Sequence, residues 1–270
     1  MWIAVLLLVI FILFLLWVFA LRGRGGKDRF EGIRGFVIAH RGLHDKPSIP
    51  ENSMSAFARA VEKGYGIELD LHLTSDGRLV VFHDNTLERT TGVEGRLKDR
   101  TFSELSALRL EGTDQRIPSF EDLLGLVGGR VPLVIELKAE GNAAALCEAT
   151  LKALEGYEGY YCIESFDPRP LLWLKKHRPD VVRGQLSQNF LKESSGLKPP
   201  LRLILTSLFL NLAVRPDFVA YNYEHKNDLP FHLCKNLWGV QSFAWTVTDK
   251  ETAEKLTEEG YIPIFEKFEF

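Results

Sequence analysis

The chain is poor in cysteine and carries no large excess of charge of either sign. Only Cys147, Cys162 and Cys234 occur among 270 residues, and no pair has C-x-x-C spacing. An odd, sparse set argues against a disulfide framework and is typical of buried, inert thiols. The formal net charge is 33 − 36 = −3. A balance this close to zero gives no general attraction to nucleic acid, so we expect no such partner.

The sequence also lacks internal repeats and low-complexity tracts. Its 270 residues are enough for one barrel-sized domain and a short appendage. We therefore divide the chain into a transmembrane helix at 1–21, a basic linker at 22–34 and one large folded domain at 35–270.

The first segment is the one long hydrophobic run. Residues 2–21 are apolar and uncharged, and about 20 such residues span a bilayer. A cleavable signal peptide is the alternative, and Val18-Phe19-Ala20 would weakly allow cleavage. No Lys or Arg precedes the run, however, so the pattern favours an uncleaved anchor.

Positive charge follows this run and does not precede it. Five basic residues lie just after it, at Arg22, Arg24, Lys27, Arg29 and Arg34. The positive-inside rule then predicts a single-pass cell-membrane protein whose catalytic domain faces the cytoplasm. The glycines among these residues indicate a flexible tether that can touch anionic headgroups.

The most informative stretch is an apolar strand at 67–73 that carries Glu68 and Asp70. Residues two apart share one face of a strand, so both carboxylates point the same way. A divalent cation with oxygen ligands (Mg²⁺, Ca²⁺ or Mn²⁺) would offset their charge. A strand whose polar face is merely hydrated is the alternative.

Three further strand ends favour the cation. His40 and Arg41 end a strand at 36–39, His83 ends a returning strand at 79–83, and Glu136 and Lys138 end a strand at 132–137. These groups suit metal-assisted phosphoryl chemistry, in which the histidines serve as acid and base. The basic side chains of Arg41 and Lys138 would hold phosphate oxygens or form salt bridges with the acids.

Strands and helices alternate along the rest of the chain. Further strands are expected at 160–164, 181–186, 217–221, 242–246 and 262–265. This pattern predicts an α/β protein, either a (β/α)₈ TIM barrel or a doubly wound open sheet. The barrel is preferred because the candidate site residues come from the ends of several strands. Residues 85–118 are too long for an ordinary connection and form an insertion after the second strand.

The order of these motifs resembles the glycerophosphodiester phosphodiesterase family. The resemblance is dense over residues 36–140 and thinner from 160 to 250. Its motifs are His40-Arg41-Gly42, Pro50-Glu51-Asn52-Ser53, Glu68-Leu69-Asp70, Thr74-Ser75-Asp76-Gly77, Val80-Val81-Phe82-His83-Asp84, Arg89-Thr90-Thr91-Gly92, Ile117-Pro118-Ser119-Phe120-Glu121, Ile135-Glu136-Leu137-Lys138, Ser165-Phe166-Asp167 and Trp245-Thr246-Val247.

The resemblance implies a role for each candidate residue and a small subdomain, formed by the insertion, over the barrel mouth. One divalent cation is expected, with Mg²⁺ or Ca²⁺ ahead of Mn²⁺. The implied roles are metal ligation for Glu68, Asp70 and Glu136, acid–base catalysis for His40 and His83, and phosphate binding for Arg41 and Lys138. Trp245 would line the substrate pocket or belong to the core. Glu51 and Asn52 would cap a helix and orient the site, or ligate directly.

Three features depart from the family pattern. Ser53 replaces the usual Thr, which is a mild change. His72 replaces a small aliphatic residue and shares a face with Asp70, as an added ligand or a packed neighbour. The tail at 265–270 lacks the usual small polar ending. The stretch 201–212 is also unusually apolar, with Arg202 its only charge. We expect it to be a buried barrel helix or a membrane contact.

The implied activity is metal-dependent hydrolysis of glycerophosphodiesters to sn-glycerol 3-phosphate and an alcohol. Lysophospholipase D or phospholipase-type cleavage of membrane lysolipids is the nearest alternative. A catalytically silent, membrane-tethered lipid-binding module is a third, which the intact set of acids and histidines disfavours. The expected partners are a small-molecule diester or lysophospholipid and the membrane, and no protein partner is implied.

Overall fold

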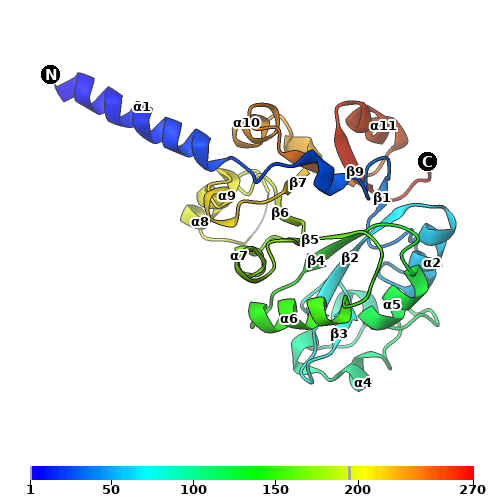
Figure 1. Ribbon diagram of the computed structural model, residues 1–270. Helices are drawn as coiled ribbons and strands as arrows, with labels where there is room; N and C mark the ends of the chain where they lie inside the picture. The colour runs from blue at the N-terminus through cyan, green and yellow to red at the C-terminus, as the bar shows by residue number, and fades with distance from the viewer. Residues whose placement is uncertain (1, 194–195) are drawn as a thin grey trace.

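Eight parallel strands close into a barrel in the computed structural model, which describes residues 2–193 and 196–270 (Figure 1). Closure follows from β1, which pairs with both β2 and β9. The barrel strands are β1 (Ile38–Ala39), β2 (Gly66–Leu73), β4 (Leu133–Leu137), β5 (Tyr161–Ser165), β6 (Arg183–Ser187), β7 (Phe218–Asn222), β8 (Gln241–Val247) and β9 (Tyr261–Phe265). The remaining strand, β3 (Leu79–Val81), turns back antiparallel to β2. The predicted TIM barrel is confirmed.

Helices surround the barrel, and polar side chains start several of them. Ser53, Ser119, Asn142, Asp167 and Asp249 each accept a hydrogen bond from the first turn of the following helix. The outer helices are α2 (Met54–Glu62), α5 (Phe120–Val127), α6 (Ala143–Ala153), α7 (Pro168–His177), α8 (Pro199–Thr206), α9 (Asn211–Val214), α10 (Leu229–Asn236) and α11 (Lys250–Glu258). The sequence reasoning missed α10, a short helix with a proline in its first turn.

The insertion after β3 folds around its own small apolar cluster. It contains α3 (Glu88–Thr91), the 3₁₀ turn η2 (Leu97–Asp99) and α4 (Phe102–Leu105). Thr101 and Glu104 form a capping box at the start of α4. Val80, Leu87 and Leu105 are fully buried within this unit.

The barrel interior is apolar near the amino ends of its strands. Phe218 and Phe243 stack there, with ring centroids 4.3 Å apart. Gly184 makes room for them, because a Cβ at this position would lie 2.2 Å from the Phe218 ring. The polar inward-facing residues lie farther along the strands, so the barrel has a dry floor and a polar mouth.

Residues 22–34 form part of this floor and differ from the flexible tether expected. The segment includes the 3₁₀ turn η1 (Lys27–Phe30). Phe30 and Ile33 are buried in the same cluster as Phe218 and Phe243. Arg29 Nε lies 3.1 Å from Asp217 Oδ1. Phe30 and Ile33 are three positions apart in a segment that is otherwise rich in glycine and charge. Their side chains close the end of the barrel where the strands begin, and we call this pair the plug.

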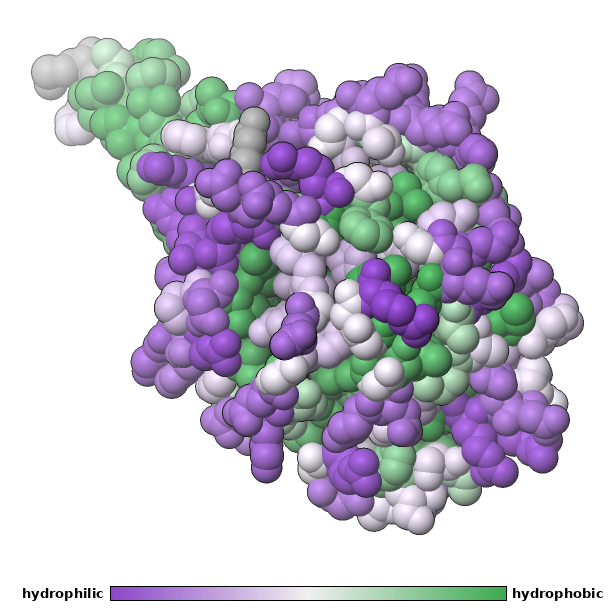
Figure 2. Space-filling model, turned by 45° about the vertical axis from the view of Figure 1, so that its right-hand side comes forward, coloured by the Kyte–Doolittle hydropathy of each residue, from purple (hydrophilic) through white to green (hydrophobic). Residues whose placement is uncertain are grey.

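The helix α1 (Trp2–Ala20) stands away from the barrel as an apolar rod (Figures 1 and 2). Nearly all of its side chains are exposed. Among residues 2–193 and 196–270 it is the single helix whose length and composition suit a membrane span, and a signal sequence at the N-terminus would share both properties. The structure therefore supports an N-terminal apolar helix.

Candidate active site

Three buried carboxylates meet at the mouth of the barrel. Glu68 and Asp70 share the inner face of β2, and Glu136 on β4 is in register with Asp70. One oxygen from each lies within 4.8 Å of the other two. Their exposed fractions are 3%, 1% and 6%, so water screens their mutual repulsion poorly.

Two cations of the chain already contact this cluster. Lys138 Nζ lies 3.0 Å from Asp70 Oδ1 and 2.8 Å from Glu136 Oε2. Arg41 Nε lies 3.7 Å from Asp70 Oδ2. Arg41 has a left-handed backbone (φ 54°), a conformation that costs free energy in a non-glycine residue. In this conformation its backbone N–H donates to Glu68 Oε2 at 2.9 Å.

Burial and charge separate the pKa values of these groups. Burial, followed by repulsion from Asp70 and Glu136, raises the pKa of Glu68 well above its usual value. Burial would also raise the pKa of Asp70, but Lys138, His83 and Arg41 outweigh it and hold that pKa below its usual range. The cluster therefore pairs an ionised Asp70 with a Glu68 that binds a proton readily.

A fourth buried carboxylate, Glu164 on β5, belongs to the same cluster. It is in register with Glu136, and burial followed by repulsion from Glu136 and Asp70 raises its pKa. The sequence reasoning missed it, although its position directly before Ser165-Phe166-Asp167 at a strand end was a usable signal.

The donor set fits a divalent cation. Four carboxylates face two basic side chains of the chain, so full ionisation of all four would leave two negative charges for a metal ion to balance. Asn52 Oδ1 and Glu164 Oε2 are buried and lack a hydrogen-bond partner among the described residues. All of these donors are oxygens, which hard cations such as Mg²⁺ and Ca²⁺ prefer. The arrangement is therefore compatible with the predicted metal, whose identity it leaves open.

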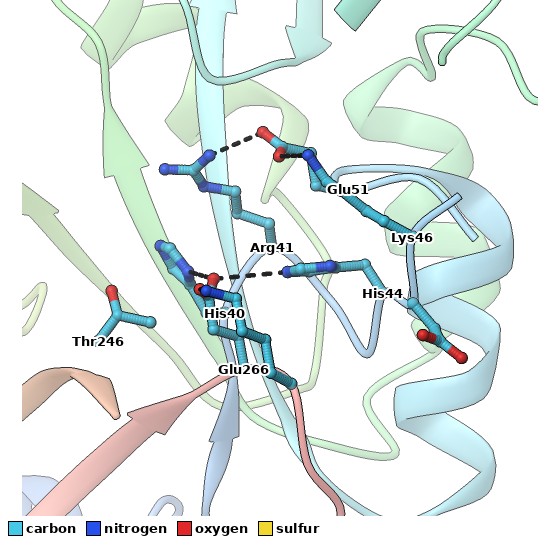
Figure 3. Close-up of a pocket in the computed structure, with 9 residues that line it drawn as sticks. His40, Arg41, His44, Lys46, Glu51, Thr246 and Glu266 are labelled. Atoms are coloured by element: carbon cyan, nitrogen blue, oxygen red, sulfur yellow. Dashed lines mark hydrogen bonds and ion pairs between the residues drawn. The ribbon is translucent and has the colours of Figure 1, made fainter. Parts of the chain in front are cut away.

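His40 lies beside this cluster and is oriented by Glu266, the residue after β9 (Figure 3). His40 Nδ1 lies 2.9 Å from Glu266 Oε2, and its Nε2 lies 3.9 Å from Glu68 Oε2. His44 Nε2 approaches the same Glu266 oxygen at 3.6 Å. Burial lowers the pKa of His40, and the bond to Glu266 opposes that shift. The unusual tail thus supplies a functional contact that the sequence reasoning did not anticipate.

The second histidine has an equivalent acidic partner. His83 Nδ1 lies 2.6 Å from Asp84 Oδ1, and the hydrogen bond to His83 helps to lower the pKa of Asp84 to about 2 against the effect of burial. His72 is buried beneath it, and its Nε2 lies 3.2 Å from the His83 carbonyl oxygen. His72 therefore packs under the His83 loop, as a neighbour of the acids.

Glu51 and Asn52 connect the site to the insertion. Glu51 forms ion pairs with Arg41 at 2.7 Å, with Lys46 at 3.0 Å and with Arg89 at 2.6 Å. Figure 3 shows the first two of these pairs. Asn52 Nδ2 donates to Asp70 Oδ2 at 2.8 Å. Both residues precede the Ser53 cap of α2, so they orient the site from the helix start.

A cavity of about 600 Å³ opens beside His40, Arg41, Lys46 and Glu266. A smaller hollow of about 90 Å³ adjoins it, lined by Glu68, His83, Glu136, Glu164 and Trp245. Trp245 packs edge-on against Phe166 at 5.7 Å, and its Nε1 has no hydrogen-bond partner in the described part of the chain. Seven of the predicted site residues line these two spaces: His40, Arg41, Glu51, Glu68, His83, Glu136 and Trp245. The other three lie beside them, since Lys138 pairs with Asp70 and Glu136, and Asn52 donates to Asp70.

A closed (β/α)₈ barrel with such groups at the carboxyl ends of its strands has the arrangement of barrel enzymes. Residues 40–266 match the model of the glycerophosphoryl diester phosphodiesterase family. The chain belongs to this family. The predictions of this family and of a phosphodiesterase are therefore confirmed.

Similar proteins agree with this membership. A glycerophosphodiester phosphodiesterase of Caldanaerobacter subterraneus subsp. tengcongensis is 36% identical over 242 residues, which cover 84% of this chain and 92% of the relative. Human glycerophosphodiester phosphodiesterase 1 is 34% identical over 159 residues, which cover 54% of this chain and 47% of the relative.

Solved structures share the fold. A phosphodiesterase of Oleispira antarctica, in complex with the product sn-glycerol-3-phosphate, has a TM-score of 0.69 at 23% identity and covers 86% of this chain and 92% of its own. A glycerophosphodiester phosphodiesterase of Thermotoga maritima has a TM-score of 0.63 at 24% identity and covers 86% and 94%.

Proposed function

We propose that this chain hydrolyses glycerophosphodiesters to sn-glycerol 3-phosphate and an alcohol with the help of one divalent cation. The observation that carries the proposal is the cluster of Glu68, Asp70 and Glu136, whose oxygens lie within 4.8 Å of one another beside two histidines and two basic side chains. Family membership and the product named for the Oleispira structure support the same reaction.

The side chains divide the work of diester cleavage. Arg41 and Lys138 hold the phosphate oxygens, the first as a fork and the second as a point charge. One histidine takes a proton either from water, which attacks the phosphorus directly, or from the glycerol hydroxyl next to the phosphate, which forms a cyclic phosphate that water then opens. The other protonates the leaving alcohol oxygen. Glu266 and Asp84 orient His40 and His83, and Trp245 lines the space for the substrate.

Glu68, Asp70 and Glu136 would hold the cation, with Asn52 and Glu164 close by. A bound cation there would neutralise phosphate oxygens and polarise the phosphorus. Mg²⁺ and Ca²⁺ are the preferred candidates, and Mn²⁺ is a third.

The test measures sn-glycerol 3-phosphate released from glycerophosphocholine and glycerophosphoethanolamine by the full chain in mild detergent. Reactions contain Mg²⁺, Ca²⁺, Mn²⁺ or EDTA. Glu68→Gln and His40→Ala should abolish release, whereas the exposed controls Glu254→Gln and His177→Ala should retain it. Release that persists in EDTA or in both site variants would refute the proposal.

Cleavage of lysophospholipids on the same site is a second candidate, and the apolar helix α1 favours it. Choline released from lysophosphatidylcholine, with no release from the soluble diesters, would establish this alternative. Bound cation with no turnover of either substrate would instead indicate a binding module.

We also propose that α1 remains attached as a single-pass anchor with the barrel on the cytoplasmic side. The uncharged run and the basic residues after it support this topology. An intact N-terminus in the membrane fraction is the expected result. Cleavage after Ala20 would show that α1 is a signal sequence.

A further inference from the structure

The helix pair α8–α9 presents an uncharged apolar surface to solvent. Between Lys198 and Arg215, every exposed side chain is apolar. We name these residues the α8–α9 face: Pro199, Pro200, Leu201, Leu203, Ile204, Phe209, Leu212 and Ala213. Leu203 is 59% exposed and Phe209 44%. The buried barrel helix that the sequence allowed is therefore not what these residues form.

The single charge in this stretch is turned away from the face. Arg202 Nε donates to the Phe190 carbonyl at 2.5 Å, and its Nη2 donates to the Leu191 carbonyl at 2.9 Å. The guanidinium thus fastens α8 to the preceding loop and leaves the apolar side chains uninterrupted. A solvated helix would normally present charged residues on such a face.

The α8–α9 face adjoins the end of α1. Trp17 Nε1 donates to the Ser207 carbonyl at 3.0 Å. Asn211 Nδ2 and Trp238 Nε1 donate to the Leu21 and Val18 carbonyls at 3.3 and 2.8 Å. These three hydrogen bonds reach backbone carbonyls at the ends of α1 and α8, where carbonyls lack the regular intrahelical partner, so the docking is specific. Figure 1 shows α8 and α9 at the base of α1.

The length of α1 sets where a bilayer would end. Its 19 residues span about 28 Å at about 1.5 Å per residue, and the hydrocarbon core is about 30 Å thick. The whole helix is therefore needed to cross, and the bilayer surface reaches its last turn. Ser207, bonded to Trp17 in that turn, then lies at the interface, where tryptophan side chains are enriched.

The connection from α1 to the barrel is short and packed. Ala20 and Leu21 at the end of α1 are fully buried, and Phe30 and Ile33 are buried in the barrel floor, so both ends of the connection pack on the barrel. The exposed Lys198 and Arg22 lie at the borders of the face and the helix, where they can meet anionic headgroups.

From these contacts we propose that the α8–α9 face lies on the bilayer and holds the barrel in one fixed orientation. The partner that covers the α8–α9 face is lipid. The segment that carries the face is hydrogen-bonded to the last turn of α1, so the lipid that surrounds α1 also contacts the face. The inference rests on the proposed anchoring by α1. It is independent of which diester the site cleaves.

The test uses the full chain in vesicles of phosphatidylcholine and phosphatidylglycerol. Leu203→Cys carries an environment-sensitive fluorophore, and the three native cysteines are buried. Val93→Cys is the matched control, since Val93 is also an exposed apolar residue. It belongs to the insertion, whose α4 lies far from α1 in Figure 1. Unsubstituted chain corrects for labelling of native thiols.

Brominated lipid chains should quench the fluorescence of the Leu203→Cys label and leave that of the Val93→Cys label unchanged. Aqueous iodide should quench the Val93→Cys label and leave the Leu203→Cys label unchanged. Equal iodide quenching at the two positions would overturn the proposal. Shielding of Leu203 from both quenchers would also overturn it and indicate a second protein copy on the face. Release of the chain by alkaline carbonate would show that the anchor itself fails. Hydrolysis of glycerophosphocholine in the same vesicles reports separately on the proposed function.

Discussion

Glu266 Oε2 lies 2.9 Å from His40 Nδ1, on the side of the imidazole away from the carboxylate cluster. Hydrogen bonds from His40 and His44 lower the pKa of Glu266, so it is an ionised acceptor at neutral pH. An ionised carboxylate only accepts, and Nδ1 must therefore carry the proton. In a neutral His40, Nε2 is then unprotonated, and its lone pair faces the carboxylate cluster.

The first prediction concerns Glu266→Gln and the order of the two histidines. Because Glu266 raises the pKa of His40, its neutral replacement should lower that pKa. If His40 is the base, the acidic limb of the kcat/KM profile moves to lower pH. If His40 is the acid, the alkaline limb moves to lower pH instead.

We expect kcat to fall about 10- to 100-fold in Glu266→Gln, as for other residues that orient a catalytic group. A pH–rate profile over the range of His titration distinguishes the two outcomes. Unchanged limbs with an unchanged kcat would show that Glu266 does not act through His40. Glu254→Gln, the same exchange at an exposed position on α11, serves as the control.

The second prediction is that cation affinity rises with pH. Burial and like charge raise the pKa of Glu68, so this group holds a proton that the cation must displace. At pH values below the raised pKa of Glu68, each bound cation displaces one proton. The affinity for the cation should therefore rise about tenfold per pH unit. Calorimetric titration of Mg²⁺ or Ca²⁺ in two buffers of different ionisation enthalpy measures the proton released. Binding that does not vary with pH would contradict this linkage.

Lys138→Ala should separate cation binding from catalysis. Lys138 lies 3.0 Å or less from two candidate metal ligands, Asp70 and Glu136. Its removal makes the cluster more negative and should strengthen cation binding. Loss of a phosphate contact should lower kcat/KM about 100-fold. Weaker cation binding in this variant would instead show that Lys138 organises the ligands.

The fourth prediction concerns stability and Glu51. Its carboxylate is largely buried among three cations, and loss of the charge in Glu51→Gln should lower the free energy of unfolding by about 3 kcal/mol. Hydrogen bonds and charge from Arg89, Arg41 and Lys46 outweigh burial and hold the pKa of Glu51 far below its ordinary value of 4.5. The stabilisation is thus present above that value and lost as pH falls toward the folded pKa.

Denaturant unfolding of both proteins at neutral and acidic pH measures this difference. It should be largest near neutrality and shrink as the solution is acidified. A constant difference at every pH would mean that shape, and not charge, accounts for the role of Glu51.

The sequence predicted what depends on local pattern. Alternating strands and helices indicated an α/β fold, and candidate site residues at several strand ends favoured the barrel. The spacing of Glu68 and Asp70 placed both on one strand face, as observed. The roles of the site residues remain predictions until they are measured.

What the sequence did not reveal depends on contacts between distant segments. Glu164 joins the acidic cluster through the β4–β5 register, and Glu266 reaches His40 across 226 positions of chain. Phe30 and Ile33 gave no local sign of burial, because their partners on β7 and β8 lie far along the chain. For the same reason, the pattern at 201–212 could not distinguish a buried helix from the exposed α8–α9 face.

The plug formed by Phe30 and Ile33 has a consequence for proteolysis. A cut in the exposed glycines Gly25 and Gly26 would break the chain between the proposed anchor and the barrel and would leave the barrel floor intact. A cut beyond Ile33 would also remove the plug and expose the Phe218 and Phe243 rings to water, at a cost of about 2 kcal/mol for each large apolar side chain lost from the floor. A few residues thus separate a cut that spares the fold from a cut that destroys it.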